Sequence, residues 1–157
     1  MARVYLETSF VSACVTERQD AASVYRRQVS TEWWGTQRDK HAHFLAEEVL
    51  AELSSPAFRH RDAALELVRG VRVLPITEDV RGLAHILVRE KVMPGPVAGD
   101  AVHVAVATVH AMDYVLTWNV RHLANANKLE HLRIVCRRVG CVPPEIVTPD
   151  LLWDYDE

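Results

Sequence analysis

The sequence predicts an α/β fold in which helices cover both faces of a mostly parallel central sheet. Short runs rich in β-branched and aromatic residues alternate along the chain with longer segments of helical periodicity. The segment 100–112 is apolar on nearly every side, which is typical of a helix buried between other elements. Because parallel strands are joined by crossover helices, the alternation indicates a sheet with a helical layer on each face.

The strand-like segments are enriched in Val, Ile, Tyr or Phe, and turn residues bound most of them. The first segment ends in a polar Thr–Ser turn, and the last leads into a terminal helical turn. The expected strands lie within residues 3–9, 41–46, 71–76, 114–119 and 141–155.

The segments between the strands have helical periodicity and recognisable ends. Asp20 and Thr77 are N-cap candidates, and Pro56 and Gly70 end the helices before them. The expected helices cover residues 21–40, 47–55, 57–70, 78–92, 100–112 and 121–140.

Length and composition predict one globular domain that spans residues 1–157. Apolar residues make up 49% of the chain and charged residues 25%, which argues against a disordered or a membrane protein. No apolar run approaches the ~20 residues that cross a bilayer, and the N-terminus lacks a secretory signal pattern. We therefore expect a cytoplasmic protein without a membrane partner. The odd number of cysteines, without a C-x-x-C pair, predicts reduced and mostly buried thiols: Cys14, Cys136 and Cys141.

The formal charge of −3 gives no global electrostatic reason to bind nucleic acid. A local basic face remains open, and so does the alternative that each basic cluster is solvated surface. The candidate clusters are Arg26 with Arg27 and Arg38, the run Arg59, His60 and Arg61, and the pair Arg121 and His122.

Polar residues follow the expected strands at the edge where functional groups gather in an open parallel sheet. Glu7 follows the first strand, and Asn119 ends the strand within 114–119. Asp100 opens the apolar helix, where the helix dipole is its ordinary explanation. An unpaired carboxylate beside a buried apolar surface is costly, however, so we expect Asp100 to have a partner.

Glu48 and Glu52 are four residues apart on one helix face, where like charges repel unless solvent or a cation balances them. Together with Glu7, Asp100 and Asn119 they offer oxygen ligands, which suit Mg²⁺ or Mn²⁺ rather than zinc. Scattered acids are also common on soluble proteins, so spacing alone leaves both a metal site and a solvated surface open.

Four stretches in this order carry a family resemblance: "VYLETS", "EEVLAEL", "GDAVHVAVA" and "YVLTWNVRHLANA". Together they resemble the PIN-domain family, which includes the VapC-like ribonuclease toxins of type II toxin-antitoxin pairs. The resemblance extends from Val4 to about Ala126. It implies a PIN-like three-layer α/β/α sandwich and RNA cleavage that depends on Mg²⁺ or Mn²⁺.

The resemblance also implies which residues bind the metal and act in catalysis: Glu7, Glu52, Asp100 and Asn119. Glu47 and Glu48 are weaker candidates than Glu52 for the second acid. Two positions depart from the family pattern, because Glu7 is one methylene longer than the usual Asp and Asn119 replaces an Asp. With one negative charge fewer, we expect one divalent ion to bind more readily than two.

The resemblance further implies roles for neighbouring side chains. Hydroxyls next to the acids are expected to orient them by hydrogen bonds: Thr8, Ser9 and Thr117. Basic side chains past the same strand are expected to contact the RNA phosphates, with Arg38 as a remoter candidate beside Arg121 and His122. The implied partners are an RNA substrate, a small antitoxin protein and a second copy of the chain in a homodimer.

A different class of function stays open. Both departures fall on ligand positions, so the protein could be a catalytically weakened PIN-like module that binds RNA or a protein. The apolar helical region 24–34 would suit docking of an antitoxin segment or a second subunit. We nevertheless expect Trp33 and Trp34 to be core or interface aromatics, and His103 to be packed or hydrogen-bonded rather than a ligand.

Overall fold

The computed structural model describes residues 1–155 and has a five-stranded sheet of order β3-β2-β1-β4-β5 at its centre. Every strand pairing is parallel, so the expected mostly parallel sheet is parallel throughout. Residues 156 and 157 of the expected domain lie outside the described part. The strand β2 His41–Ala46 matches its expected segment, and the other four are shorter than expected: β1 Ala2–Leu6, β3 Arg72–Leu74, β4 Tyr114–Leu116 and β5 Glu145–Val147.

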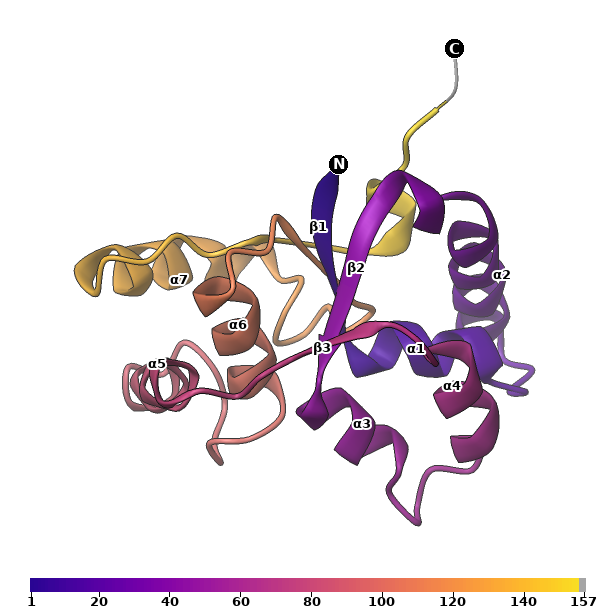
Figure 1. The fold of residues 1–157 in the computed structure, drawn as a ribbon, viewed down its shortest axis with the longest axis horizontal. Coiled ribbons are helices and arrows are strands. Elements are labelled where there is room, and N and C mark those ends of the chain that lie inside the picture. Colours follow the sequence, from indigo (N-terminus) through magenta and orange to yellow (C-terminus); the bar gives the residue numbers. More distant parts are fainter. Residues whose placement is uncertain (156–157) are drawn as a thin grey trace.

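Helices cover both faces of this sheet, as the sequence predicts. In Figure 1, α1, α2 and α4 lie on one side of the strands, and α5, α6 and α7 lie on the other. Short 3₁₀ turns, η1 and η2, precede β2 and follow β5. The elements are α1 Thr8–Val15, α2 Ala21–Thr36, η1 Arg38–Lys40, α3 Glu47–Leu53, α4 Arg61–Leu67, α5 Glu78–Arg89, α6 Asp100–Val109, α7 Ala126–Arg138 and η2 Pro149–Leu151.

The sequence analysis missed α1, because it interpreted the residues after β1 as a turn. The helix has only eight residues, and its N-cap is Glu7, a residue type outside the preferred set of short polar caps. Its apolar residues nevertheless have helical spacing, since Phe10, Val11 and Cys14 are all buried. That spacing was the available signal.

Two expected helices begin later than predicted, because local hydrogen bonds close turns before them. The backbone N–H groups of Ala57 and Phe58 bind the hydroxyl and the carbonyl of Ser55, so α4 starts only at Arg61. Similarly, Asn125 Oδ1 accepts from the N–H of residue 127 and caps α7. The predicted caps Asp20 and Thr77 are confirmed.

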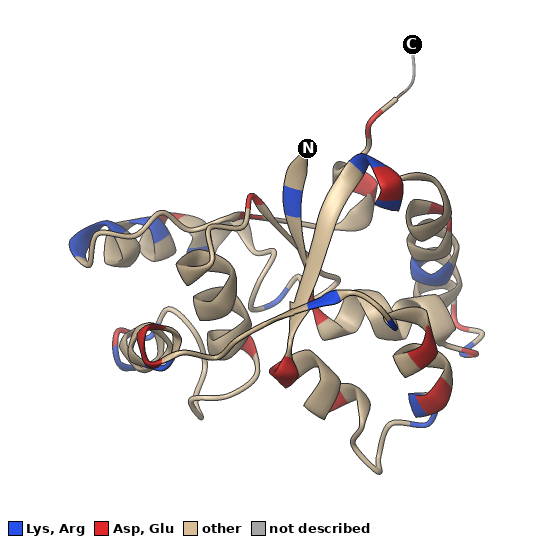
Figure 2. Cartoon of the chain, viewed as in Figure 1, with Lys and Arg blue, Asp and Glu red and all other residues tan. Residues whose placement is uncertain are grey.

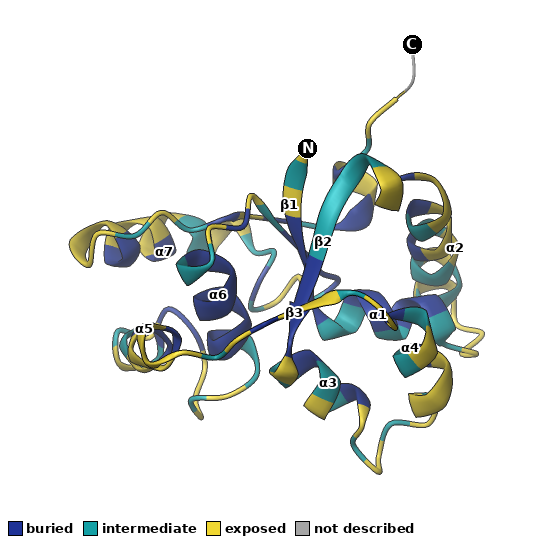
Figure 3. Cartoon of the chain, viewed as in Figure 1, coloured by how far each residue is buried: buried dark blue, intermediate teal, exposed yellow. Residues whose placement is uncertain are grey.

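The core confirms the predicted burial of the apolar helix and of one tryptophan. All residues from 101 to 108 of α6 are buried, and Figure 3 shows this helix as one of the most deeply buried elements. Trp33 is fully buried, and its indole N–H donates to the carbonyl of Leu152 at 2.7 Å. The cysteines form no disulfide, and burial raises the pKa of the Cys14 thiol to about 12. Within residues 1–155, no helix combines the length and the apolar character that crossing a bilayer requires.

The strand order creates a crevice at the carboxyl ends of β1 and β4. The chain proceeds outward from β1 to β2 and β3, and then returns to place β4 on the other side of β1. Ligands bind at such a switch point in open parallel sheets. Leu6 is in register with Leu116, so Glu7 and Thr117 follow their strands at matching positions.

Candidate active site at the carboxyl ends of β1 and β4

Glu7 lies one residue beyond β1 and caps α1. Its backbone N–H donates to the carbonyl of Leu116 at 3.1 Å, which extends the pairing with β4. Its side chain turns back toward the helix, and Oε2 accepts from the backbone N–H of Ser9 at 2.7 Å. The carboxylate therefore takes part in the local structure of α1 as well as in the crevice.

Two hydroxyls hold the same oxygen of Glu7. Ser9 Oγ donates to Oε2 at 2.5 Å, and Thr117 Oγ1 donates to it at 3.0 Å. Ser9 Oγ also accepts from the N–H of Trp118 at 2.8 Å, and Thr117 Oγ1 accepts from the N–H of Asn119 at 3.0 Å. The start of α1 and the turn after β4 are therefore joined around one carboxylate.

The Glu7 side chain is almost fully buried, with 5% of the residue exposed. Burial raises the pKa of this carboxyl, while the charge of His103 and the hydrogen bonds from Ser9 and Thr117 act in the opposite direction. The pKa stays above its ordinary value. Because burial disfavours the ionised form, a nearby positive charge would stabilise this carboxylate more than an exposed one.

Glu52 on α3 is joined to two other elements through one oxygen. Thr8 Oγ1 donates to Glu52 Oε1 at 2.6 Å, and His103 Nε2 lies 2.5 Å from the same oxygen. The other ring nitrogen of His103 lies 2.7 Å from the hydroxyl of Tyr5. His103 and Tyr5 are both fully buried. His103 is thus hydrogen-bonded at both nitrogens, as the sequence analysis expected.

The acids around His103 determine its charge. Burial alone would lower its pKa, but the hydrogen bond with Glu52 and the charges of Glu7, Glu52 and Glu48 raise it above the ordinary value. Burial would raise the pKa of Glu52, and the hydrogen bond and charge of His103 hold it below the ordinary value instead. Burial, followed by the same acids, raises the pKa of Tyr5 well above its usual range. His103 and Glu52 therefore each favour the charged form of the other.

Asp100 meets Asn119 at the start of α6. Asn119 Nδ2 donates to Asp100 Oδ1 at 3.2 Å, so the expected partner of Asp100 is an amide. The amide oxygen of Asn119 accepts from the N–H of His122 at 3.0 Å, which fixes the orientation of the amide. Asn119 thus presents its nitrogen to Asp100, and direct metal coordination by Asn119 stays a prediction.

Glu48 has a separate task on α3. Its Oε1 accepts from the backbone N–H of Gly99 at 2.8 Å and so ties the loop before α6 to α3. Gly99 has a φ of 55°, which glycine tolerates without strain, and a Cβ added there would lie 3.9 Å from Glu52 Oε2. Glu52 thus contacts Thr8 and His103 of the site, whereas Glu48 contacts the loop before α6, and the choice of Glu52 as the second site acid stays a prediction.

The carboxylates fit a hard divalent cation in their chemistry. Glu7 Oε2, Glu52 Oε1 and Asp100 Oδ1 accept hydrogen bonds, whereas no donor within residues 1–155 reaches the second oxygen of any of them. Such oxygens are the ligands that Mg²⁺ and Mn²⁺ prefer. In the described chain, however, no three His, Cys, Asp or Glu side chains are arranged as a metal-binding group. The right donor atoms are present without being gathered around one point.

The structure does not bring the predicted RNA-binding residues together. Arg121 and His122 follow Asn119 in the turn after β4 and stay beside the crevice. Arg38 lies in η1, at the amino end of β2, and its guanidinium lies 5.4 Å from the ring centroid of Trp34. The six residues of β2 extend about 20 Å, which separates Arg38 from the crevice. The structure therefore places Arg38 away from the crevice, and a contact between Arg38 and RNA stays a prediction.

Charge is distributed unevenly between these regions. Figure 2 shows acidic positions where α3 and α6 begin, beside the carboxyl end of β2, and basic positions along α7. Two residues bonded to this network were not predicted from the sequence: Tyr5, whose hydroxyl bonds His103, and Trp118, whose backbone N–H donates to Ser9 Oγ. Tyr5 resembles any core residue of a strand, whereas Trp118 stands inside the motif "TWN" and carried a positional signal.

Comparisons with known proteins identify the fold. No family model matches the sequence, and no curated protein matches it. Among solved structures, the sarcin-ricin loop cleaving toxin VapC20 from Mycobacterium tuberculosis has a TM-score of 0.57 at 21% identity, covering 76% of this chain and 92% of that one. A chain of VapBC2 from Rickettsia felis, bound to a DNA fragment from their promoter, has a TM-score of 0.52 at 13% identity, covering 93% and 98%. The protein therefore has the PIN-domain, VapC-like fold that the sequence resemblance predicts.

Proposed function

We propose that the protein is a divalent-metal-dependent ribonuclease and the toxin of a type II toxin-antitoxin pair. The observation that carries the proposal is that hydrogen bonds from the start of α1 and the turn after β4 hold Glu7, Glu52 and Asp100 beside the switch point of a VapC-like fold. The fold is also that of VapC20, which is a toxin that cleaves the sarcin-ricin loop. Hard oxygen donors at such a position suit hydrolysis of a phosphodiester.

Two consecutive hydroxyls at the start of α1 organise the proposed site. Thr8 binds Glu52 and Ser9 binds Glu7, so one turn of helix orients acids from two different elements. Hydrogen-bonded neighbours of this kind fix the direction of ligand oxygens. The Asn119 amide holds Asp100 in the same way, on the β4 side of the crevice.

Glu7, Glu52 and Asp100 are the residues that would hold Mg²⁺ or Mn²⁺. The bound ion would supply an activated water and balance the charge on the scissile phosphate. His103, hydrogen-bonded to Glu52, favours the ionised form of that acid, which is the form that binds a cation. Arg121 and His122 follow Asn119 closely in the chain, so they would contact a phosphate at the same edge of the sheet.

An antitoxin partner is part of the proposal, because the second structural neighbour is the VapBC2 complex. A homodimer is proposed from the family resemblance alone. Both are tested together by mass measurement of the protein, first by itself and then after co-expression with the small protein encoded beside it. We expect the protein by itself to be a dimer and to form a tighter mixed complex after co-expression. A monomer that does not bind the co-expressed small protein would contradict this part of the proposal.

The nuclease assignment is tested by incubating single-stranded and structured RNA with the protein in Mg²⁺, in Mn²⁺ and in EDTA. We expect cleavage with either metal and none in EDTA. Asp100→Asn should reduce cleavage about a hundredfold, because it removes one carboxylate ligand. Asp79→Asn is the matched control, since Asp79 is an exposed acid in the first turn of α5. Equal activity of both variants would contradict the assignment.

A binding module without cleavage is the second candidate, and one observation favours it. The amide oxygen of Asn119 is occupied by the His122 N–H, and no acidic cluster in residues 1–155 is gathered around a point. If RNA binds with the same affinity in EDTA and in Mn²⁺ and is never cut, this candidate replaces the nuclease.

A further inference from the structure

A basic groove opens beside the candidate active site and is not explained by the acids. It has a volume of about 300 Å³, within the range of small ligand sites. The start of α1, the start of α2, the loop before α4 and the turn after β4 each contribute to its walls. The lining residues that matter below are Ser9, Arg18, Arg26, His60, Trp118 and Asn119.

The groove is continuous with the candidate active site. Ser9 lines the groove and also donates to Glu7, while Asn119 lines the groove and donates to Asp100. The N–H of Trp118 is bound by Ser9 Oγ, so the floor of the groove and the acids belong to one hydrogen-bonded unit. A chain molecule that occupied the groove would therefore reach the acids at its Asn119 end.

Arg26 is fixed in the groove by an aromatic ring rather than by an acid. Its guanidinium lies 5.5 Å from the ring centroid of Trp118. That ring is held from inside, because its indole N–H donates to Ser30 Oγ at 2.7 Å and the ring of Tyr25 packs edge-on against it. Within residues 1–155, no carboxylate lies within ion-pair distance of Arg26. A stacked guanidinium without a counter-charge is preorganised to bind an anion.

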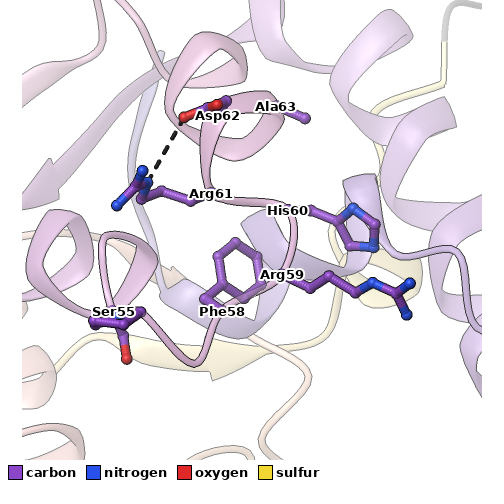
Figure 4. Close-up of a pocket in the computed structure, with 8 residues that line it drawn as sticks. Ser55, Phe58, Arg59, His60, Arg61, Asp62 and Ala63 are labelled. Atoms are coloured by element: carbon purple, nitrogen blue, oxygen red, sulfur yellow. Dashed lines mark ion pairs between the residues drawn. The ribbon is translucent and has the colours of Figure 1, made fainter.

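The rest of the lining is also suited to an anion. No Asp or Glu of the described chain lines the groove, although Arg18 at its rim makes an exposed ion pair with Asp20 at 3.8 Å. His60 belongs to the loop of the neighbouring pocket that Figure 4 shows. There Arg59 and His60 point to one side, whereas Arg61 points away and pairs with Asp62 at 3.7 Å. Of these basic residues, His60 lines the groove.

We propose that this groove binds the phosphate backbone of RNA next to the cleavage point, with Arg26, stacked on Trp118, as the principal phosphate ligand. The inference rests on the proposed ribonuclease function and joins two of the basic clusters found in the sequence, through Arg26 and His60, in one binding surface. RNA is favoured over an acidic protein segment because the groove runs directly into the carboxylates proposed to act on a phosphodiester.

The test is RNA binding in EDTA, where cleavage cannot interfere. The probe is a fluorescein-labelled oligouridylate of about twelve nucleotides, and the readout is its fluorescence anisotropy. Arg26→Ala is expected to weaken binding about tenfold and to reduce the slope of log K against log salt by about 0.7. Arg26→Lys keeps the charge and should leave the slope unchanged while weakening binding about threefold.

Arg72→Ala is the matched control, because Arg72 is likewise stacked on an aromatic ring, 5.7 Å from the centroid of Phe44, but lies in the edge strand β3 and does not line the groove. It should leave binding and slope unchanged. Thermal denaturation of all variants checks that each is folded. Equal effects of Arg26→Ala and Arg72→Ala would overturn the inference, and so would displacement of the RNA by an equal concentration of oligoglutamate.

The outcomes also separate this inference from the proposed function. If Asp100→Asn abolishes metal-dependent cleavage while Arg26→Ala binds RNA as well as the wild type, the groove assignment fails alone. If no form of the protein cuts RNA but Arg26→Ala still weakens binding with the smaller salt slope, the groove assignment holds and the nuclease assignment fails.

Discussion

The two ends of the central sheet hold histidines in opposite electrostatic settings. At the carboxyl end, His103 is bonded at both ring nitrogens, and although burial alone would lower its pKa, the hydrogen bond and charge of Glu52 help to raise it. At the amino end, His41 is stacked on Trp33 at 5.9 Å, and neither ring nitrogen has a partner within residues 1–155. There burial lowers the pKa.

The difference distinguishes a site from a packing region. A buried network in which His103 is bonded at both ring nitrogens requires specific residues on several elements, and it lies where hydrogen bonds also hold Glu7, Glu52 and Asp100. At the amino end, the rings of His41 and His43 and the guanidinium of Arg38 pack against tryptophans, and Trp33 bonds the backbone carbonyl of Leu152. A histidine or a tryptophan-stacked arginine therefore indicates a site only together with the groups around it.

The largest expected difference between the ends concerns the chemistry itself. Glu52→Gln should lower RNA cleavage about a hundredfold, because the variant keeps an oxygen for Thr8 and His103 but loses the charge. Glu47→Gln, at the exposed first residue of the same helix, should leave the rate unchanged. Cleavage rates in Mn²⁺ check this. A larger loss of cleavage in Glu47→Gln than in Glu52→Gln would identify Glu47 as the second site acid.

The next effect is on stability. Tyr5→Phe leaves the buried Nδ1 of His103 without a partner and should lower the free energy of unfolding by about 1–3 kcal/mol. His41→Phe removes a ring that makes no hydrogen bond to the described chain, so stability should change by less than about 0.5 kcal/mol. Urea denaturation measures both. Equal losses would remove the contrast between the two ends.

A third change sharpens the role of Asn119. Asn119→Asp replaces the amide donor to Asp100 by a second carboxylate, so it should cost about 1 kcal/mol of stability without a divalent ion. With Mn²⁺ the same charge should tighten ion binding about tenfold, and the melting temperature should rise more than in the wild type. Thermal denaturation with and without Mn²⁺ decides this. Equal Mn²⁺ shifts in both proteins would mean that Asn119 does not face the ion.

The smallest effect is a pH dependence from the amino end. The lowered pKa of His41, caused first by burial, means that the unfolded chain binds this proton more readily than the folded one. Stability from this group is therefore complete above the ordinary histidine pKa and lost as the pH falls toward the lowered value. Between about pH 7 and pH 5, the melting temperature of His41→Phe should fall less than that of the wild type. An equal fall in both proteins would mean that the acid sensitivity comes from other groups.

His103 contributes with the opposite sign. Its raised pKa stabilises the fold below the ordinary histidine pKa, and that contribution disappears as the pH rises through the raised value. In the His41→Phe variant, the loss of stability as the pH rises should therefore be clearer, because the opposite contribution of His41 is absent.

Sequence alone predicted the layers and the parallel sheet, because alternation of strand and helix patterns is a local property. The order of the strands depends on long-range packing and could not be predicted in this way. The helix α1 was not predicted because it is short and capped by Glu7. The acids were predicted through a family resemblance, and the hydroxyls Thr8 and Ser9 do bind them. Arg38, the remoter RNA-contact candidate, precedes β2 in the chain and so lies at the amino end of that strand, whereas Glu7 and Asn119 follow their strands.

The Arg26–Trp118 pair could not be predicted from spacing, because the two residues meet only after α2 and the turn following β4 pack together. Tyr5 likewise had no signal, since its hydroxyl acquires a role only through His103 on another element. Contacts between residues far apart in sequence are therefore visible only in the folded structure.

The central claim, that the acids at the carboxyl end of the sheet hold a divalent ion, is tested most directly by titrating Mn²⁺ into the protein and following free Mn²⁺ by electron paramagnetic resonance. Glu7→Gln, Glu52→Gln and Asp100→Asn should each weaken binding about tenfold or more, because each removes one charged ligand. Asp79→Asn should bind as the wild type does. Unchanged Mn²⁺ affinity in all three site variants would contradict the claim.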